Sequence, residues 1–207
     1  MKIIDISNDL LTAEVYEGDP IPEIVEVKSM KKGDTCNLNA LYTGLHNGTH
    51  IDAPLHFIDD GKSIEEMPLD AFIGECTVLS VGAGIITGEI VENIFPRKCE
   101  RLLIKSNGRA FIHETAAQEM AYLGYKLIGT DGVTIEPEFG NGKAHKALLS
   151  ENIAILEGIN LSAVADGNYF LIAPPIKISE AEAAPSRAIL ISDYVFWSGK
   201  ADVGGKI

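Results

Sequence analysis

Three of the five histidines, His46, His50 and His56, lie within eleven residues, and Asp52 lies between the last two. All four occupy even positions, so an extended chain would point their side chains to one face. Imidazole and carboxylate groups bind zinc, manganese and iron, and a centre with positions open to water can carry out hydrolysis. The alternative is a polar loop held by hydrogen bonds. Because three histidines and a carboxylate share a two-residue period, we interpret the cluster as a metal centre.

The residues between the histidines favour an extended chain over a helix. A helix would place His46 and His50 one turn apart, as in metal-binding helices. Asn47 and Gly48 are poor helix formers, however, and Pro54 disfavours helix in the residue before it. Four residues of extended chain span ~13 Å, which is about the most that two imidazoles on one ion could bridge. A metal centre therefore predicts a bulge or kink at Gly48, where glycine permits unusual backbone angles.

The segment HNGTHIDAPLH, residues 46–56, resembles the HxGTHxDxPxH signature of the bacterial kynurenine formamidase and cyclase family of metal-dependent hydrolases. Downstream, His145 and Glu157 resemble the two remaining ligands of the family's binuclear site, at the family's separation. The resemblance extends towards both ends of the chain, through residues 4–7, 16–20 and 186–190.

The resemblance implies a site for two divalent metal ions, with zinc as the first choice and manganese as the second. His46 and His50 would bind one ion, and His145 would bind the other. Asp52 and Glu157 would bridge the pair, since a carboxylate has two oxygens to share between cations. The ligand types themselves accept zinc, manganese and iron alike.

The resemblance also implies that His56 is the general acid/base, because an imidazole with a pKa near 6.5 suits proton transfer to a leaving nitrogen. Tyr16 stands where the formamidases have a tryptophan against the aromatic substrate, and a tyrosine can also stack on an aniline ring. Thr49 is either a hydrogen-bond donor behind the ligands or an ordinary turn hydroxyl.

The expected reaction is hydrolysis of an amide or formamide, with N-formylkynurenine as the leading substrate and kynurenine and formate as products. An isatin-like lactam substrate is one alternative. A metal-binding protein without hydrolytic activity is the other. His56 favours an enzyme, because a purely structural site has no need of a histidine that binds no metal.

Short apolar and β-branched segments bounded by turn residues predict seven strands. They are residues 2–7, 76–81, 102–105, 126–129, 154–156, 169–173 and 188–192. Apolar spacing predicts a helix over 113–123 that stops at Gly124, and shorter helices over 144–151 and 89–94. Strands interleaved with helices indicate one α/β domain over residues 1–207, with a mixed sheet and flanking helices. The family resemblance implies a swivelling β/β/α (cyclase-like) fold and a homodimer or homotetramer.

Composition argues against several other classes of protein. The chain has 17 Lys+Arg against 30 Asp+Glu, a net charge of -13, so nucleic acid is not an expected partner. No apolar segment reaches the ~20 residues that a membrane span needs. Three widely spaced cysteines suit free, mostly buried thiols in a reducing compartment. We therefore expect a cytoplasmic protein that acts on a small-molecule amide and has no membrane partner.

Three further features carry no predicted chemistry. His113 is expected at a helix terminus or on the surface, and Asp131 in a turn rather than at the site. Residues 196–207 are expected either as an extended tail that lies on another subunit or as a frayed terminus.

Overall fold

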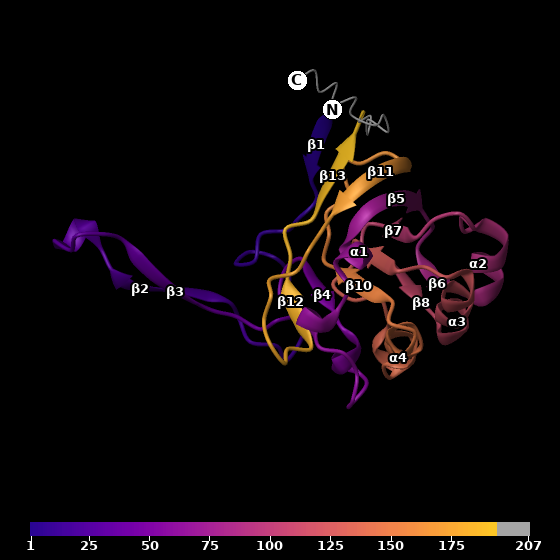
Figure 1. Ribbon diagram of the computed structural model, residues 1–207, viewed down its shortest axis with the longest axis horizontal. Coiled ribbons are helices and arrows are strands. Elements are labelled where there is room, and N and C mark those ends of the chain that lie inside the picture. Colours follow the sequence, from indigo (N-terminus) through magenta and orange to yellow (C-terminus); the bar gives the residue numbers. More distant parts are fainter. Residues whose placement is uncertain (194–207) are drawn as a thin grey trace, which may run out of the picture.

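A mixed sheet of nine strands runs through the described part of the protein, residues 1–193 of a computed structural model (Figure 1). Its order is β1-β13-β11-β5-β7-β9-β10-β4-β12, with parallel pairing from β5 to β10 and antiparallel pairing elsewhere. The strands are β1 (Lys2–Asp5), β4 (His50–Asp52), β5 (Ile73–Ser80), β7 (Arg101–Lys105), β9 (Leu127–Thr130), β10 (Ala154–Glu157), β11 (Gly167–Ile172), β12 (Ala183–Pro185) and β13 (Ile189–Ser192). The predicted tail over 196–207 lies outside the described residues.

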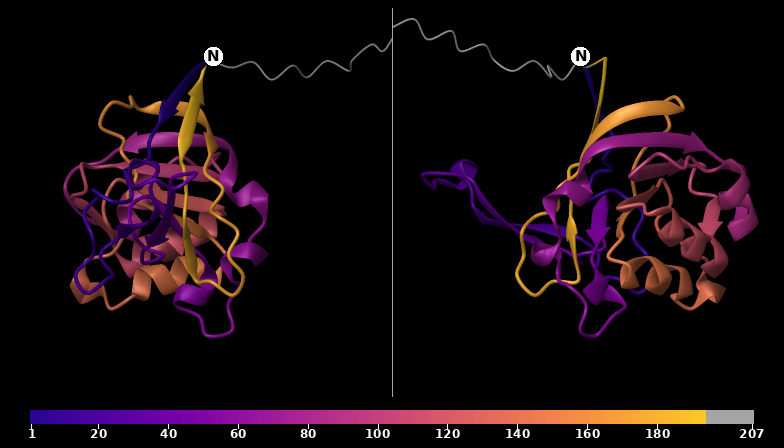
Figure 2. Two further views of the ribbon diagram at one scale, coloured as in Figure 1. Left: turned by 90° about the vertical axis from the view of Figure 1, so that its left-hand side faces the viewer. Right: turned by 45° about the vertical axis from the view of Figure 1, so that its right-hand side comes forward.

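Three helices cover one face of this sheet around its parallel strands (Figures 1 and 2). They are α2 (Gly88–Ile94), α3 (Glu114–Leu123) and α4 (Lys143–Ser150), and a single-turn helix, α1 (Leu69–Phe72), precedes β5. A short parallel pair, β6 (Gly84–Ile86) and β8 (Ala110–Ile112), lies beside α2 and α3.

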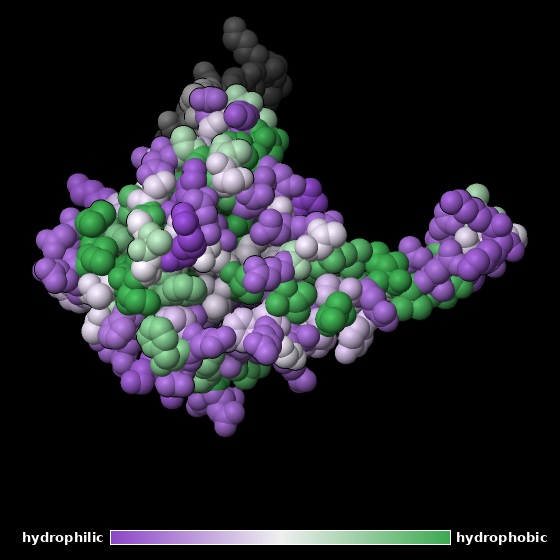
Figure 3. All heavy atoms as spheres, turned by 180° about the vertical axis from the view of Figure 1, so that it is seen from behind, coloured by the Kyte–Doolittle hydropathy of each residue, from purple (hydrophilic) through white to green (hydrophobic). Residues whose placement is uncertain are grey.

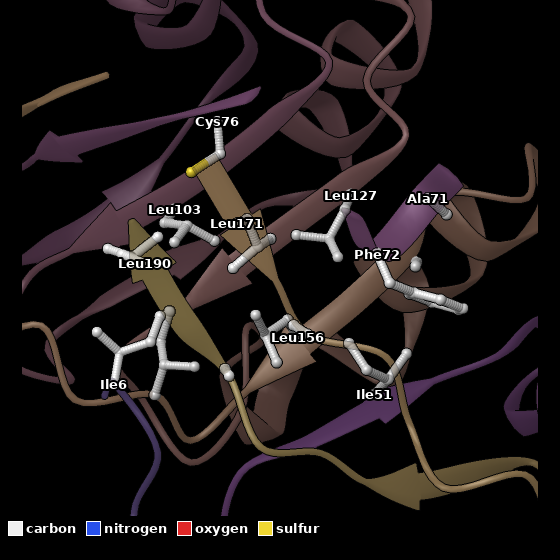
Figure 4. Close-up of a cluster of buried hydrophobic side chains, with 14 of the residues drawn as sticks. Ile6, Ile51, Ala71, Phe72, Cys76, Leu103, Leu127, Leu156, Leu171 and Leu190 are labelled. Atoms are coloured by element: carbon white, nitrogen blue, oxygen red, sulfur yellow. The ribbon is translucent and has the colours of Figure 1, made fainter. Parts of the chain in front are cut away.

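The parallel strands are buried on both faces, which explains why they form continuous apolar runs. Leu103, Leu127 and Leu156 point into one core cluster (Figure 4). Their neighbours Leu102 and Ile128 point to the other cluster, under the helices. The sheet therefore separates two apolar layers. A polar side chain at the end of a parallel strand lies at the margin of one of these layers.

The predicted fold class, mixed α/β with flanking helices, is confirmed. All seven predicted strands and all three helices are present within a few residues of their expected bounds, and α3 ends at Gly124, whose φ of +79° suits glycine. The sequence analysis missed the short strands β6, β8 and β12 and the hairpin of β2 (Glu23–Lys28) with β3 (Leu38–Tyr42), whereas β4 lies within the extended segment expected around the histidines.

That hairpin, which we call the arm (residues 20–44), projects far from the rest of the protein (Figures 1 and 2). Every residue of β2 and β3 is exposed. A short 3-10 turn, Met30–Lys32, closes its tip, where Gly33 takes a left-handed conformation.

The three cysteines are free, but the expectation of mostly buried thiols is wrong for Cys36. It is exposed near the tip of the arm, whereas Cys76 is buried and Cys99 half-buried. Among the described residues, no helix has the length and apolar character that crossing a membrane requires.

Candidate metal centre

Four of the predicted ligands meet where β4 lies beside β10. Antiparallel pairing places His50 opposite Glu157 and Asp52 opposite Ile155. Because side chains alternate along a strand, the three polar side chains share the face of Ile155, which the helices cover. Helix α4 packs against β10 on this face and contributes His145. Strand pairing and one helix therefore assemble ligands from positions about one hundred residues apart.

A tight turn before β4 carries the fifth predicted ligand, His46. Gly48 has a φ of +64°, and a Cβ there would lie 3.1 Å from the Cα of Leu10, so conformation and space both favour glycine. The kink predicted at Gly48 is confirmed. The carbonyl oxygen of Gly48 also lies 3.1 Å from His50 Nδ1, and a proton on that nitrogen leaves Nε2 free to face the centre.

The expectation that all four members of the cluster lie on one extended segment is wrong in part. Only His50 and Asp52 lie on β4. His46 is in the preceding turn, and His56 ends a 3-10 turn that begins at Pro54. Proline at the first position of such a turn presets its φ, so the chain leaves the strand just after Asp52.

The donor atoms form two overlapping groups. In the first, Asp52 Oδ1 lies 2.9 Å from His46 Nδ1 and 3.4 Å from His50 Nε2. In the second, which also contains Asp52, His145 Nε2 lies 3.3 Å from Glu157 Oε1. Each group offers one donor atom per residue, all within 4.8 Å of one another. Asp52 belongs to both groups, and Glu157 Oε2 lies 3.5 Å from His50 Nε2, so both carboxylates stand between the histidines.

Three atoms at the middle of the site make no hydrogen bond of regular geometry among residues 1–193, although Asp52 Oδ1 lies close to His46 and His50. They are His50 Nε2 and the two carboxylate oxygens of Asp52, and both residues are at most 1% exposed. An unpaired buried polar group costs ~1–3 kcal/mol, so native proteins pair nearly all of them. A divalent cation would pair all three atoms, and imidazole nitrogen and carboxylate oxygen are donors that such cations accept. The residues present therefore fit a metal ion.

Glu136, which the sequence analysis missed, holds His145 from behind. Its Oε2 lies 2.9 Å from His145 Nδ1, and its carboxylate accepts hydrogen bonds from the backbone N–H groups of Lys143, Ala144 and His145. It therefore caps the first turn of α4 and turns His145 Nε2 towards the centre. Gly140 leaves room for this, since a Cβ there would lie 2.1 Å from the Glu136 carboxylate. The only signal in the sequence was an acidic residue shortly before a predicted helix.

The carboxylates of the site keep His50 and His145 protonated in the metal-free protein. Burial by itself lowers the pKa of His50, but the adjacent Asp52 and Glu157 outweigh it and raise that pKa to about 10. At His145, burial again lowers the pKa by itself. The adjacent Glu136 and Glu157 outweigh it and raise the pKa of His145 to about 10. A cation that binds these nitrogens must therefore displace protons, and its affinity should rise with pH.

We expect Glu136→Gln to weaken zinc binding about 10- to 100-fold, because a neutral amide orients His145 less firmly than a carboxylate does. The amide oxygen can still accept from the α4 backbone, so the fold should survive. Competition with a chelator gives the zinc dissociation constant, and the melting temperature of the metal-free protein reports on the fold. Glu138→Gln, on the exposed side of the same loop, is the control. Native zinc affinity in Glu136→Gln would leave this residue only its helix-capping role.

A pocket of about 260 Å³ opens over the donor atoms, a size suited to a small molecule. His56 lines it, with its ring centroid 4.1 Å from that of His46. Burial lowers the pKa of His56 below its ordinary 6.5, so the imidazole is neutral at neutral pH. Phe57 stacks on His145 with centroids 4.8 Å apart, and Tyr16, 42% exposed, lines the same pocket.

Three other polar residues considered in the sequence analysis have structural roles. Thr49 donates to the carbonyl of Gly158 at 2.6 Å, next to Glu157, and so ties β4 to β10 behind the ligands. His113 caps the N-terminus of α3, as expected. Asp131 accepts five hydrogen bonds from four donor groups of residues 106–108, which confirms its role in a turn.

Comparison with known proteins finds relatives over most of the chain. Residues 4–137 match the family model described as Putative cyclase. A kynurenine formamidase of Delftia acidovorans is 35% identical over 202 residues, which cover 91% of this chain and 97% of that protein. A solved structure described as a potential metal-dependent hydrolase with cyclase activity is 27% identical, with a TM-score of 0.79 over 91% of this chain and 96% of its own. Isatin hydrolase A of Labrenzia aggregata, at 21% identity, has the same fold, with a TM-score of 0.75 over 91% of this chain and 93% of its own.

Proposed function

The chain belongs to the cyclase family, and from this membership we propose that it is a metal-dependent hydrolase of the amide bond of an aryl formamide. One observation carries the proposal. His56 stands in the pocket beside two donor groups that share Asp52, yet it belongs to neither group. A site that only bound metal would have no use for this histidine, whereas hydrolysis needs a group that moves protons.

We assign the ligands to two divalent ions, zinc first and manganese as the alternative. His46 and His50 would hold one ion and His145 the other, and the Asp52 and Glu157 carboxylates would each be shared between the two. When bound, such ions supply Lewis-acid activation of water and of a carbonyl oxygen.

The chain's own residues then position and move protons. Neutral His56 takes a proton from the attacking water as the new C–O bond forms, and delivers it to the leaving nitrogen as the C–N bond breaks. Glu136 keeps His145 in one tautomer during this exchange. Phe57 stacks on His145 and so shields one face of that ring. The products are a carboxylic acid, here formate, and a free amine.

N-formylkynurenine is the substrate that we favour, with hydrolysis giving kynurenine and formate. Its aryl ring suits the apolar wall that Tyr16, Phe57 and Val133 provide. Its amino-acid tail carries an ammonium group, and Asp19, half-buried, lines the same pocket. An isatin-like lactam has no cation for Asp19 to attract, which is why we place it second. A metal-binding protein without activity is the third reading, and the position of His56 argues against it.

The test is hydrolysis of N-formylkynurenine by protein that has been stripped with a chelator and reloaded separately with zinc and manganese. We expect no turnover by the stripped protein and restored turnover with one or both ions. Hydrolysis of isatin but not of N-formylkynurenine would indicate that the substrate is a lactam. Tight metal binding with neither activity would leave a metal-binding protein.

Asp19→Asn should lower kcat/KM for N-formylkynurenine up to about 5-fold, since a solvent-accessible ion pair contributes ~0.2–1 kcal/mol. Formanilide, which has the same aryl formamide and no ammonium group, should be hydrolysed at the native rate by this variant. Steady-state kinetics with both substrates measures the difference. An equal loss on both substrates would mean that Asp19 shapes the pocket and does not recognise the tail.

We also propose that the protein is cytoplasmic and that it assembles with further copies of the chain.

A further inference from the structure

Asn47 follows the predicted ligand His46 in the turn before β4, yet it belongs to neither donor group. Its side chain is buried, and its Nδ2 donates to the carbonyl of Pro20 at 2.7 Å and to Thr43 Oγ1 at 3.2 Å. The Thr43 hydroxyl donates its own proton to the carbonyl of Gly44, so its oxygen accepts from Asn47. The amide of Asn47 therefore joins both ends of the arm to the turn that carries His46.

The segment that enters the arm forms one wall of the pocket over the donor atoms. Tyr16 and Asp19 both line that pocket. The backbone N–H of Asp19 donates to the carbonyl of Tyr16 at 3.0 Å, which closes a turn directly before Pro20. We call residues 16–20 the pocket turn. Its place relative to the donor atoms decides where these two side chains meet a bound molecule.

A single hydrogen bond ties the pocket turn to the rest of the protein. Among residues 1–193, the bond from Asn47 to Pro20 is the only one that joins residues 14–22 to another part of the chain. None of residues 14–20 is buried. The arm on their C-terminal side gives little support, because its shaft stands clear of the body with apolar side chains exposed (Figure 3). A segment with so few contacts opens easily once its anchor is lost.

We propose that Asn47 is a positioning residue for the substrate, which holds Tyr16 and Asp19 in place over the metal centre. The inference rests on the proposed function, in which these side chains meet the aryl ring and the ammonium group. His46 and Asn47 are consecutive residues of one turn, so the segment that supplies a ligand also places a wall of the pocket. Loss of the Asn47 amide would displace that wall and leave every predicted ligand present.

The surroundings of Asn47 indicate a role other than stability. Its Oδ1 has no hydrogen-bond partner among residues 1–193, and a buried oxygen without a partner is destabilising. The packing around its nitrogen is close, since a Cβ on Gly44 would lie 3.2 Å from Pro20 Cδ and 3.3 Å from Asn47 Nδ2. An apolar side chain would avoid the unpaired oxygen but could not hold Pro20. The N–H groups of Asn47 therefore explain its presence better than its burial does.

The first test is amide hydrogen exchange of the full chain reloaded with zinc, measured by mass spectrometry on peptides that cover residues 14–22. We expect exchange there to be about 10-fold faster or more in Asn47→Ala than in the native protein, with exchange in α4 unchanged. Asn47→Ser, whose polar side chain is one bond too short to reach Pro20, should behave like the alanine variant and is the milder change to a buried position.

Thr43→Val is the matched control, because it removes the other acceptor of the Asn47 amide and leaves the bond to Pro20 in place. It should exchange like the native protein in residues 14–22. Native exchange in both Asn47 variants would overturn the proposal. An equal rise in Thr43→Val would overturn it as well, because Asn47 would then act through the arm and not through the pocket turn.

The second test asks whether the pocket turn matters to the substrate. We expect Asn47→Ala to keep its full complement of zinc and to raise KM for N-formylkynurenine about 10-fold, with kcat changed by less than about 3-fold. In a background that carries Tyr16→Ala and Asp19→Asn, the same substitution should have no further effect on KM, because the contacts that it displaces are already absent. An equal rise of KM in both backgrounds would refute the positioning role.

The outcomes separate this inference from the proposed function. A native protein that hydrolyses neither N-formylkynurenine nor formanilide would contradict the proposed function, and the substrate role of Asn47 with it. An active native protein whose KM is unchanged in Asn47→Ala would contradict the inference alone.

Discussion

Asp52→Ala protein is expected to leave gel filtration without stoichiometric metal, and to have lost about 1000-fold or more in kcat/KM, equivalent to ~4 kcal/mol. Asp52 belongs to both donor groups, with Oδ1 2.9 Å from His46 Nδ1 and 3.4 Å from His50 Nε2. Its removal therefore takes a ligand from both positions at once. Elemental analysis of the purified variant measures the effect.

Two comparisons separate metal loss from misfolding. Asp131→Ala removes an equally polar carboxylate that serves a turn, and should keep its metal. The circular dichroism spectrum of Asp52→Ala should match that of the metal-free native protein. Without the Asp52 carboxylate beside them, the histidines of the site can stay neutral, and a neutral imidazole can be buried at little cost. A fully metallated and active Asp52→Ala protein would remove Asp52 from the centre.

The sequence identified the residues whose donor atoms the structure brings together, but not the path of the chain between them. A two-residue period over His50 and Asp52 correctly implied a shared face, and the demand for a kink at Gly48 was correct because two ligands so close in sequence need a turn. The two-residue period did not place His56 correctly, because Pro54 starts a 3-10 turn that ends at His56. A constant period assumes a constant backbone conformation, and one proline is enough to end it.

His145 and Glu157 were implied by family resemblance alone, because nothing local marks a histidine inside a helix or a glutamate at a strand end. The structure shows what brings them together, which is the register of β4 on β10 and the packing of α4. Glu136 was missed for the same reason. Its partners are the first backbone N–H groups of α4 and a ring nitrogen of His145, and neither contact follows from spacing.

The arm could not be predicted from the rules that located the other strands. Those rules rest on burial, and β2 and β3 have no buried face. Residues 24–28, Ile-Val-Glu-Val-Lys, combine β-branched and charged side chains, a composition typical of an edge strand. A strand pair without a buried face therefore offers little pattern to a sequence analysis that rests on burial.

His56→Ala is expected to keep its full complement of metal and to lose about 100- to 10,000-fold in kcat, the usual contribution of a general acid/base. His56 lies in the pocket with its ring 4.1 Å from His46 and 6.1 Å from His145, yet it is in neither donor group. Its loss should therefore leave metal binding unchanged. Because the side chain moves a proton and does not hold the substrate, KM should change far less than kcat.

Metal analysis and steady-state kinetics on one preparation give both quantities, and His113→Ala, which alters only a helix cap, should match the native enzyme in both. A glutamine at position 56 keeps the polarity of the histidine but cannot carry a proton at neutral pH, so His56→Gln should be as slow as the alanine variant. Native turnover in either variant would show that protons travel by another route. Loss of metal from both would instead make His56 a sixth ligand, and the pocket would then need a different base.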